Sequence, residues 1–159
     1  RGYMDGLKTS GTEILSLEGG ENPEATLGAM RAGKPLIYQG TLAGDRFAGR
    51  PDLLVKVARK SSLGEHAFTI RDTKLGRHPK PHYLVQLCVY ADLLESMQGH
   101  RPERFSIVLG NGREQWFRTD DFFFYYLTLK AAFERVLAVW HVAEADGERG
   151  VRMNFKELA

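Results

Sequence analysis

Cysteine is almost missing from this sequence of 159 residues, in which Cys88 stands alone. A single thiol excludes an intrachain disulfide, and it excludes a zinc or iron–sulfur site built from cysteines of this chain. It is also typical of a reducing compartment, so we expect a cytoplasmic protein. Because Cys88 lies within the apolar run Leu84–Tyr90, we predict a buried and unreactive thiol.

Long hydrophobic runs are missing too. No apolar run approaches the ~20 residues of a bilayer-spanning helix, and no secretory signal is visible, so we expect no membrane partner. The charge excess is small, since 22 basic and 20 acidic residues leave a net charge of +2. This balance does not by itself indicate nucleic acid, because nucleic-acid binders concentrate their cations on one face. One such cluster of basic residues lies between Arg71 and His82. It could form a nucleic-acid-binding surface, but an ordinary solvated loop explains it equally well.

Hydrophobic residues make up 43% of the sequence, which is enough for a core and favours one main domain. Apolar periodicity, with the positions of glycine and proline, predicts helix, strand, helix, three strands, helix, hairpin and helix in that order. This order predicts an α/β fold with a mixed central β-sheet flanked by helices. The helices are expected at about residues 1–10, 23–33, 82–98 and 121–144, and the strands at 12–17, 35–40, 52–57, 68–74, 105–109 and 114–118.

Two aspartates would face each other across one predicted hairpin. If its turn centres on Ser62, then Asp52 and Asp72 stand ten residues before and after the centre and lie opposite each other. Opposed residues of an antiparallel pair have Cβ atoms about 4.5–5.5 Å apart, and two like charges so close destabilise the pair. A divalent cation would relieve the repulsion, and Mg²⁺ is commonly held by one or two carboxylates.

A lysine completes this arrangement. Lys74 follows Asp72 by two residues, so both side chains lie on the same face of the strand. Its ammonium can orient an attacking water or stabilise charge on a phosphate. The alternative is that these are ordinary solvent-facing charges. The apolar residues Phe68 and Ile70, which precede Asp72 on its own face, favour a buried site instead.

Gln86 and Tyr90 lie four residues apart on the predicted helix of residues 82–98, and therefore share one face of it. A glutamine inside an apolar helix is costly unless it is hydrogen-bonded. One interpretation directs both side chains at the carboxylate site or at a phosphate. The other pairs the glutamine with nearby backbone.

Aromatic residues and further cations are secondary candidates. Trp116 and the run Phe122–Tyr126 could stack on bases, but consecutive aromatics point around a helix, so we predict that most of them are core. Arg50, Arg77 and Lys80 are candidates for phosphate contacts, although each is also explained as a plain surface charge.

At these positions the sequence resembles the RecB-like branch of the PD-(D/E)XK nucleases, some of which are joined to a helicase. That branch has a G-x-x-D strand, a D-x-K strand and a Q-x-x-x-Y helix in this order. The resemblance covers roughly residues 1–130. Within that range, residues 29–40 resemble the segment that precedes the first acid in bacterial RecB-like nucleases. The motifs stand here as Gly49-Arg50-Pro51-Asp52, Asp72-Thr73-Lys74 and Gln86-Leu87-Cys88-Val89-Tyr90.

The resemblance implies a restriction-endonuclease-like (PD-(D/E)XK) core at residues 1–145. Asp52, Asp72 and the backbone carbonyl of Thr73 would hold Mg²⁺ or Mn²⁺, and Lys74 would be the catalytic lysine. Gln86 and Tyr90 would support the site or touch DNA. The implied reaction is hydrolysis of phosphodiester bonds, in single-stranded DNA or at DNA ends, during DNA repair, recombination or defence.

Two departures from the family pattern matter. Family members often carry a further histidine or glutamate ligand in an upstream helix. That helix is expected to be truncated at Arg1, and within this chain Glu24 is a weak substitute. Four cysteines hold an iron–sulfur cluster in many relatives, and Cys88 alone cannot hold one.

The missing upstream ligand motivates an alternative function, a DNA-binding module that has lost catalysis and serves a partner helicase. A phosphohydrolase of small nucleotides is a third hypothesis. Residues 146–159 are expected to form a C-terminal extension.

Overall fold

The computed structural model describes residues 2–19, 22–143 and 153–154. In these ranges the helices are α1 (Gly2–Thr9), α2 (Pro23–Arg31), α3 (Pro81–Gln98) and α4 (Asp120–Ala143). The strands are β1 (Ile14–Ser16), β2 (Leu36–Tyr38), β3 (Leu42–Ala43), β4 (Phe47–Gly49), β5 (Leu53–Val57), β6 (Ala67–Thr73), β7 (Arg104–Val108), β8 (Glu114–Arg118) and β9 (Met153–Asn154). The predicted elements are all present, with boundaries shifted by a few residues.

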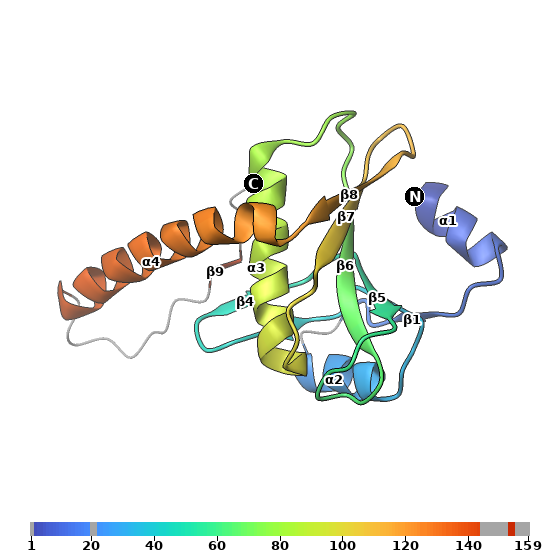
Figure 1. Ribbon diagram of the computed structural model, residues 1–159, viewed down its shortest axis with the longest axis horizontal. Helices are drawn as coiled ribbons and strands as arrows, with labels where there is room; N and C mark the ends of the chain where they lie inside the picture. Colours follow the sequence, from blue (N-terminus) through green and yellow to red (C-terminus); the bar gives the residue numbers. More distant parts are fainter. Residues whose placement is uncertain (1, 20–21, 144–152, 155–159) are drawn as a thin grey trace.

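The central sheet has the strand order β1-β2-β5-β6-β7-β8. Strand β1 runs parallel to β2 and β6 runs parallel to β7, whereas the other neighbouring strands are antiparallel. Helices α3 and α1 lie on opposite sides of this sheet (Figure 1). The molecule is therefore an α/β fold with a mixed central sheet flanked by helices, as predicted.

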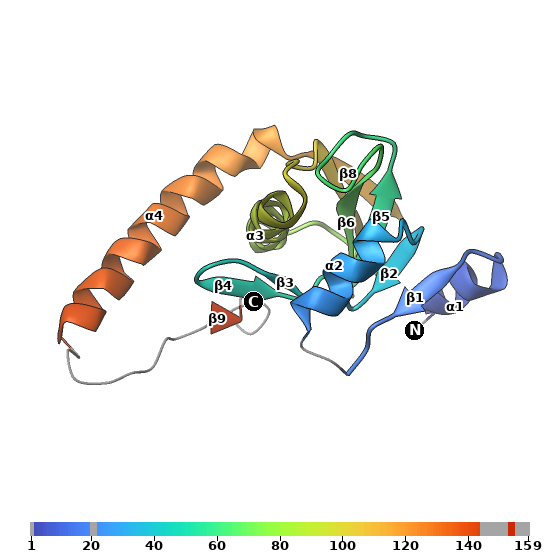
Figure 2. The same ribbon diagram turned by 90° about the horizontal axis from the view of Figure 1, so that it is seen from below.

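Helix α3 is enclosed on several sides. It packs against β6, against α4 and against β3, and Figure 2 shows it between the sheet and α4. Buried side chains therefore occur around its circumference, as the consecutive buried residues from Leu87 to Ala91 show, and as its nearly uniform hydrophobicity predicts. The helix ends at Gly99, whose φ of 68° is the left-handed conformation that glycine adopts without strain.

The hairpin of β5 and β6 has the predicted register. Leu53 lies opposite Arg71, and Val57 lies opposite Ala67. Because side chains alternate along a strand, Phe68, Ile70 and Asp72 share the face that packs on α3, whereas Thr69, Arg71 and Thr73 point to the other face. The side chains of Phe68, Ile70 and Asp72 are fully buried, whereas Arg71 and Thr73 are partly exposed, consistent with this division.

A small second sheet was not predicted. Its order is β3-β4-β9, and its strands contain only two or three residues. Such short strands show no periodicity that distinguishes them from loops. Strand β9 lies in the predicted C-terminal extension and pairs parallel with β4, so that Met153 faces Phe47. The other residues of 146–159, and the domain boundary at 145, lie outside the described residues.

The prediction that most aromatics of α4 are core is only partly correct. Phe123 and Tyr126 are buried, but Phe124 and Tyr125 are 77% and 64% exposed. Trp116 on β8 is also exposed, at 45%. Across the described ranges, no helix combines the length and the apolar character needed to cross a membrane.

Candidate active site

The two aspartates meet where β5 begins and β6 ends. Asp52 directly precedes β5, and the register of the hairpin, continued by one residue, places it opposite Asp72. The backbone N–H of Asp52 donates a 3.0 Å hydrogen bond to Oδ1 of Asp72. The Asp72 side chain is fully buried, and Asp52 is partly buried. Two carboxylates are thus held together with little access to water.

Three donors from two segments hold the Asp52 carboxylate. Its Oδ2 accepts hydrogen bonds from the backbone N–H of Thr73 at 2.8 Å and from the Thr73 hydroxyl at 2.7 Å. Its Oδ1 accepts one from the side-chain amide of Gln39 at 3.2 Å. Hydrogen bonds to a charged carboxylate are stronger than neutral ones, so this network fixes the orientation of Asp52.

Lys74 joins the acid pair to α3. Its Nζ lies 3.1 Å from Oδ2 of Asp72 and donates a 2.7 Å hydrogen bond to Oε1 of Gln86. It also lies 4.9 Å from the centre of the Tyr83 ring, in cation–π geometry. The side chain is only 15% exposed. The predicted convergence of two acids and one amine is therefore present in the structure.

Tyr90 and Gln86 continue this network into the core. The Gln86 side-chain amide donates a 3.0 Å hydrogen bond to the Tyr90 hydroxyl, so Gln86 bonds to two side chains rather than to backbone. Burial raises the pKa of Tyr90 far above its ordinary value, and the charges of Asp72 and Asp52 raise it further. The phenol thus stays protonated. Its ring leaves no room at Gly49, where a Cβ atom would lie 2.6 Å from Cε1 of Tyr90.

The oxygen donors of this site fit a hard divalent cation. Among the described residues, no group of three or more histidine, cysteine, aspartate or glutamate side chains is placed to hold a metal, so an ion at Asp52 and Asp72 would take its other ligands from backbone oxygens or water. The Thr73 carbonyl is suited to this, because Pro51 stands opposite Thr73 in the continued register and has no N–H to donate. Glu24, the weak substitute for the upstream ligand, is exposed in the first turn of α2.

The predicted phosphate-contacting cations are placed differently from one another. Lys80 is exposed, and its Nζ lies 6.0 Å from the centre of the same Tyr83 ring that Lys74 approaches. Arg50 is partly buried between Gly49 and Pro51. Arg77 is exposed in the loop between β6 and α3. Lys80 therefore shares the Tyr83 ring with Lys74 of the acid site.

The thiol of Cys88 plays no part in this network. It is fully buried on α3, and burial raises its pKa to about 12, with a further contribution from Asp92. The thiolate is therefore negligible at neutral pH, consistent with the predicted inert residue.

Sequence reasoning assigned no role to Gln39, which the structure places in the site. Its φ of 57° is the one positive value among the described non-glycine residues. Besides the side-chain contact with Asp52, its backbone N–H donates a 3.0 Å hydrogen bond to the Asp52 carbonyl. The pattern Gln39-Gly40 at the end of a strand carries no signal for such a conformation, because residues other than glycine rarely adopt it.

No model of a known protein family matches the chain, and no curated protein sequence matches it. The fold itself establishes the class, an α/β protein with a mixed central sheet.

Proposed function

We propose that this chain is a metal-dependent deoxyribonuclease with a RecB-like, restriction-endonuclease-like core, which hydrolyses phosphodiester bonds of single-stranded DNA or DNA ends. The observation that carries the proposal is the opposition of Asp52 and Asp72, with the ammonium of Lys74 in contact with Asp72. The order of the three motifs around these residues supports it.

The charge balance of the site favours a bound cation. Two carboxylates and one ammonium leave one formal negative charge in a region where Asp72 is fully buried. A buried charge is costly unless it is compensated. Mg²⁺ or Mn²⁺ held by Asp52, Asp72 and the Thr73 carbonyl would offset it. When bound, such an ion acidifies water and polarises a phosphoryl oxygen.

The residues of the chain position the reacting groups. The ammonium of Lys74 has three N–H donors; one hydrogen-bonds Gln86, and the ammonium also forms an ion pair with Asp72. A remaining donor would serve a phosphate oxygen or an attacking water, whose negative charge it would stabilise. Tyr90 holds Gln86, and Gln86 holds Lys74, so the lysine is oriented before substrate arrives. Lys80, which lies near the Tyr83 ring beside Lys74, would contact a neighbouring phosphate of the bound DNA strand.

Substitution of Asp72 tests the proposal. We expect D72A to lose cleavage of a labelled single-stranded oligonucleotide in Mg²⁺ or Mn²⁺ by about 10³-fold or more, since the ion loses one of its two carboxylate ligands and Lys74 loses its partner. D121A, which removes an exposed aspartate from α4, is the matched control and should cut like the parent. Equal cleavage by D72A and D121A would refute the assignment.

A specific observation favours the second candidate, a nuclease-like DNA-binding module without catalysis that serves a helicase. Three of the four carboxylate oxygens accept hydrogen bonds from Gln39, Thr73 or the Asp52 backbone, and the fourth, Oδ2 of Asp72, lies within ion-pair distance of Lys74. A self-contained polar network of this kind needs no ion. Binding of DNA by the parent, with no cleavage in either metal, would establish this candidate, whereas metal-dependent cleavage that D72A abolishes would eliminate it.

A further inference from the structure

The face of the sheet that points away from α3 carries a second pair of like charges. Arg104 on β7 lies opposite Arg118 on β8, and both side chains are exposed. Trp116 lies on the same face, opposite Ser106, because residues two apart on a strand share a face. Two guanidinium groups and one indole thus lie on a single patch at the β7–β8 edge of the sheet.

The two arginines differ from their neighbours on this face. Arg71 forms an ion pair with Glu114 at 2.8 Å, and Arg59 forms one with Glu103 at 3.0 Å. Within the part of the chain that the structure describes, Arg104 and Arg118 have no acidic partner. Like charges placed directly opposite on paired strands are unfavourable, and a bound anion would relieve this repulsion.

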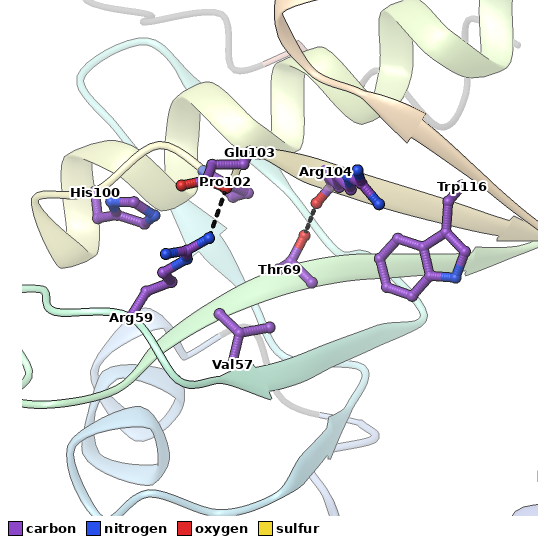
Figure 3. A pocket seen from close by; sticks show the side chains of 8 residues that line it. All are labelled: Val57, Arg59, Thr69, His100, Pro102, Glu103, Arg104 and Trp116. Atoms are coloured by element: carbon purple, nitrogen blue, oxygen red, sulfur yellow. Dashed lines mark hydrogen bonds and ion pairs between the residues drawn. The ribbon is translucent and has the colours of Figure 1, made fainter.

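A cavity adjoins the exposed tryptophan. It has a volume of about 170 Å³, and Val57, Pro102 and the Trp116 ring supply its apolar lining. Its polar lining residues are Arg59, Thr69, His100, Glu103 and Arg104, and Glu103 is paired with Arg59. Figure 3 shows these side chains, with Trp116 and Arg104 on the same side of the sheet and the Thr69 hydroxyl donating to the Arg104 carbonyl. A flat aromatic ring beside an apolar hollow suits a stacked ring better than it suits a charged side chain.

We propose that Trp116, Arg104 and Arg118 form an accessory binding platform for single-stranded nucleic acid, with a base stacked on Trp116 and flanking phosphates at the two arginines. A single strand supplies both a flat base to stack on Trp116 and phosphates for the two arginines, whereas the acidic side chains of a peptide supply only the negative charge. Because β8 is the last strand of the sheet, no neighbouring strand of that sheet blocks the approach.

The platform lies on the opposite face of the sheet from the acid pair, so it holds the strand without taking part in its cleavage. The proposal rests on the proposed function for the identity of its ligand. Binding in the absence of metal is measured separately from cleavage, so either can fail while the other stands.

The experiment measures binding of a fluorescein-labelled oligothymidylate by the whole chain in EDTA, by anisotropy over a range of salt concentrations. We expect R104A/R118A to bind about tenfold or more weakly than R31A/R135A, which removes two exposed arginines elsewhere. The slope of log K against log salt should become shallower by about 1.4, because each phosphate contact on a single strand contributes about 0.7.

Trp116 provides an independent readout. Loss of one stacked base costs about 1–3 kcal/mol, so W116L should bind roughly 5- to 150-fold more weakly, whereas W116F retains a ring and should stay close to the parent. Saturating oligothymidylate should quench part of the parent fluorescence, and that part should be absent in W116F. All variants are exposed-residue changes, and their thermal unfolding checks that they remain folded.

Three results would overturn the platform: equal binding by R104A/R118A and R31A/R135A, tryptophan quenching that W116F shares with the parent, or self-association of the parent that R104A/R118A abolishes, which would mark this face as a contact between two copies of the chain. D72A should bind like the parent in EDTA. A parent that binds through the platform but does not cut in metal would refute the nuclease proposal alone.

Discussion

Two cross-strand pairs of like charge lie on opposite faces of the same sheet. Asp52 and Asp72 face α3 and are enclosed by donors from Gln39, Thr73 and Lys74. Arg104 and Arg118 are exposed on the other face and, in the described ranges, have no acidic partner. The charge of the first pair is partly compensated inside the protein by Lys74, whereas the second pair is exposed to solvent.

The difference follows from the cost of each location. A buried carboxylate must be paired or hydrogen-bonded, since water cannot stabilise it. Exposed guanidinium groups are hydrated and screened by salt, so their repulsion is small. The acid pair therefore lowers the stability of the fold, and we infer a functional reason for it. The arginine pair lowers the stability very little, and the argument for its role in binding depends on the neighbouring Trp116.

The largest expected effect comes from removing the ammonium group of Lys74, which forms an ion pair with Asp72. K74M should lower the free energy of unfolding by about 3 kcal/mol, because it leaves the buried Asp72 carboxylate without its ammonium partner. D72N/K74M, which also removes the charge of Asp72, should recover most of that loss. Urea unfolding of the parent, both single variants and the double variant measures the coupling; a K74M protein as stable as the parent would show that Lys74 does not compensate Asp72.

Packing behind the acid pair gives the next effect. G49A should destabilise the protein by about 1–3 kcal/mol, since its Cβ atom would meet the buried Tyr90 ring. G28A is the matched change, at an exposed helix position with nothing within 4 Å, and should stabilise by about 0.5–1 kcal/mol. Thermal unfolding should shift in opposite directions for the two variants, and a shift in the same direction would contradict this packing.

Gln39 tests whether backbone strain supports the acid pair. Q39A and Q39G both lose the amide that contacts Asp52, so both should reduce metal-dependent cleavage. Q39G should nevertheless be about 1 kcal/mol more stable than Q39A, because only glycine adopts a φ near 57° without strain. Chemical denaturation compares the two directly, and a less stable Q39G, which is the usual order for these residues, would rule out the strained conformation.

The smallest effect is expected on the open face. R104A/R118A should change the free energy of unfolding by no more than about 0.5 kcal/mol at moderate salt, since exposed charges are screened. The same denaturation experiment at low salt should move the double variant toward greater stability than the parent. A loss of more than about 2 kcal/mol would mean that these arginines are structural and would remove the contrast between the two pairs.

The sequence predicted the parts of the site that depend on periodicity. Placing the turn of the β5–β6 hairpin at Ser62 set the opposition of Asp52 and Asp72, and alternation placed Lys74 beside Asp72. Helical spacing put Gln86 and Tyr90 on one face. These inferences succeed because strands and helices have fixed repeats.

The remaining parts depend on contacts between distant segments. The residues next to Gln39 in the sequence do not indicate its positive φ. That conformation is held by hydrogen bonds to Asp52, 13 residues further along the chain. Strands β3 and β4 are too short to show alternation. The exposure of Trp116 depends on which helices cover the outer face of the sheet, and a hairpin sequence by itself does not contain that information.

The most direct test of the account is a crystal of the chain soaked in Mn²⁺ and measured with anomalous scattering. If the acid pair holds a metal ion, we expect one strong peak between the carboxylates of Asp52 and Asp72, within coordination distance of both and of the Thr73 carbonyl, and no peak at that position in D72N. A parent crystal with manganese bound elsewhere, and with Lys74 still filling the space beside Asp72, would contradict it.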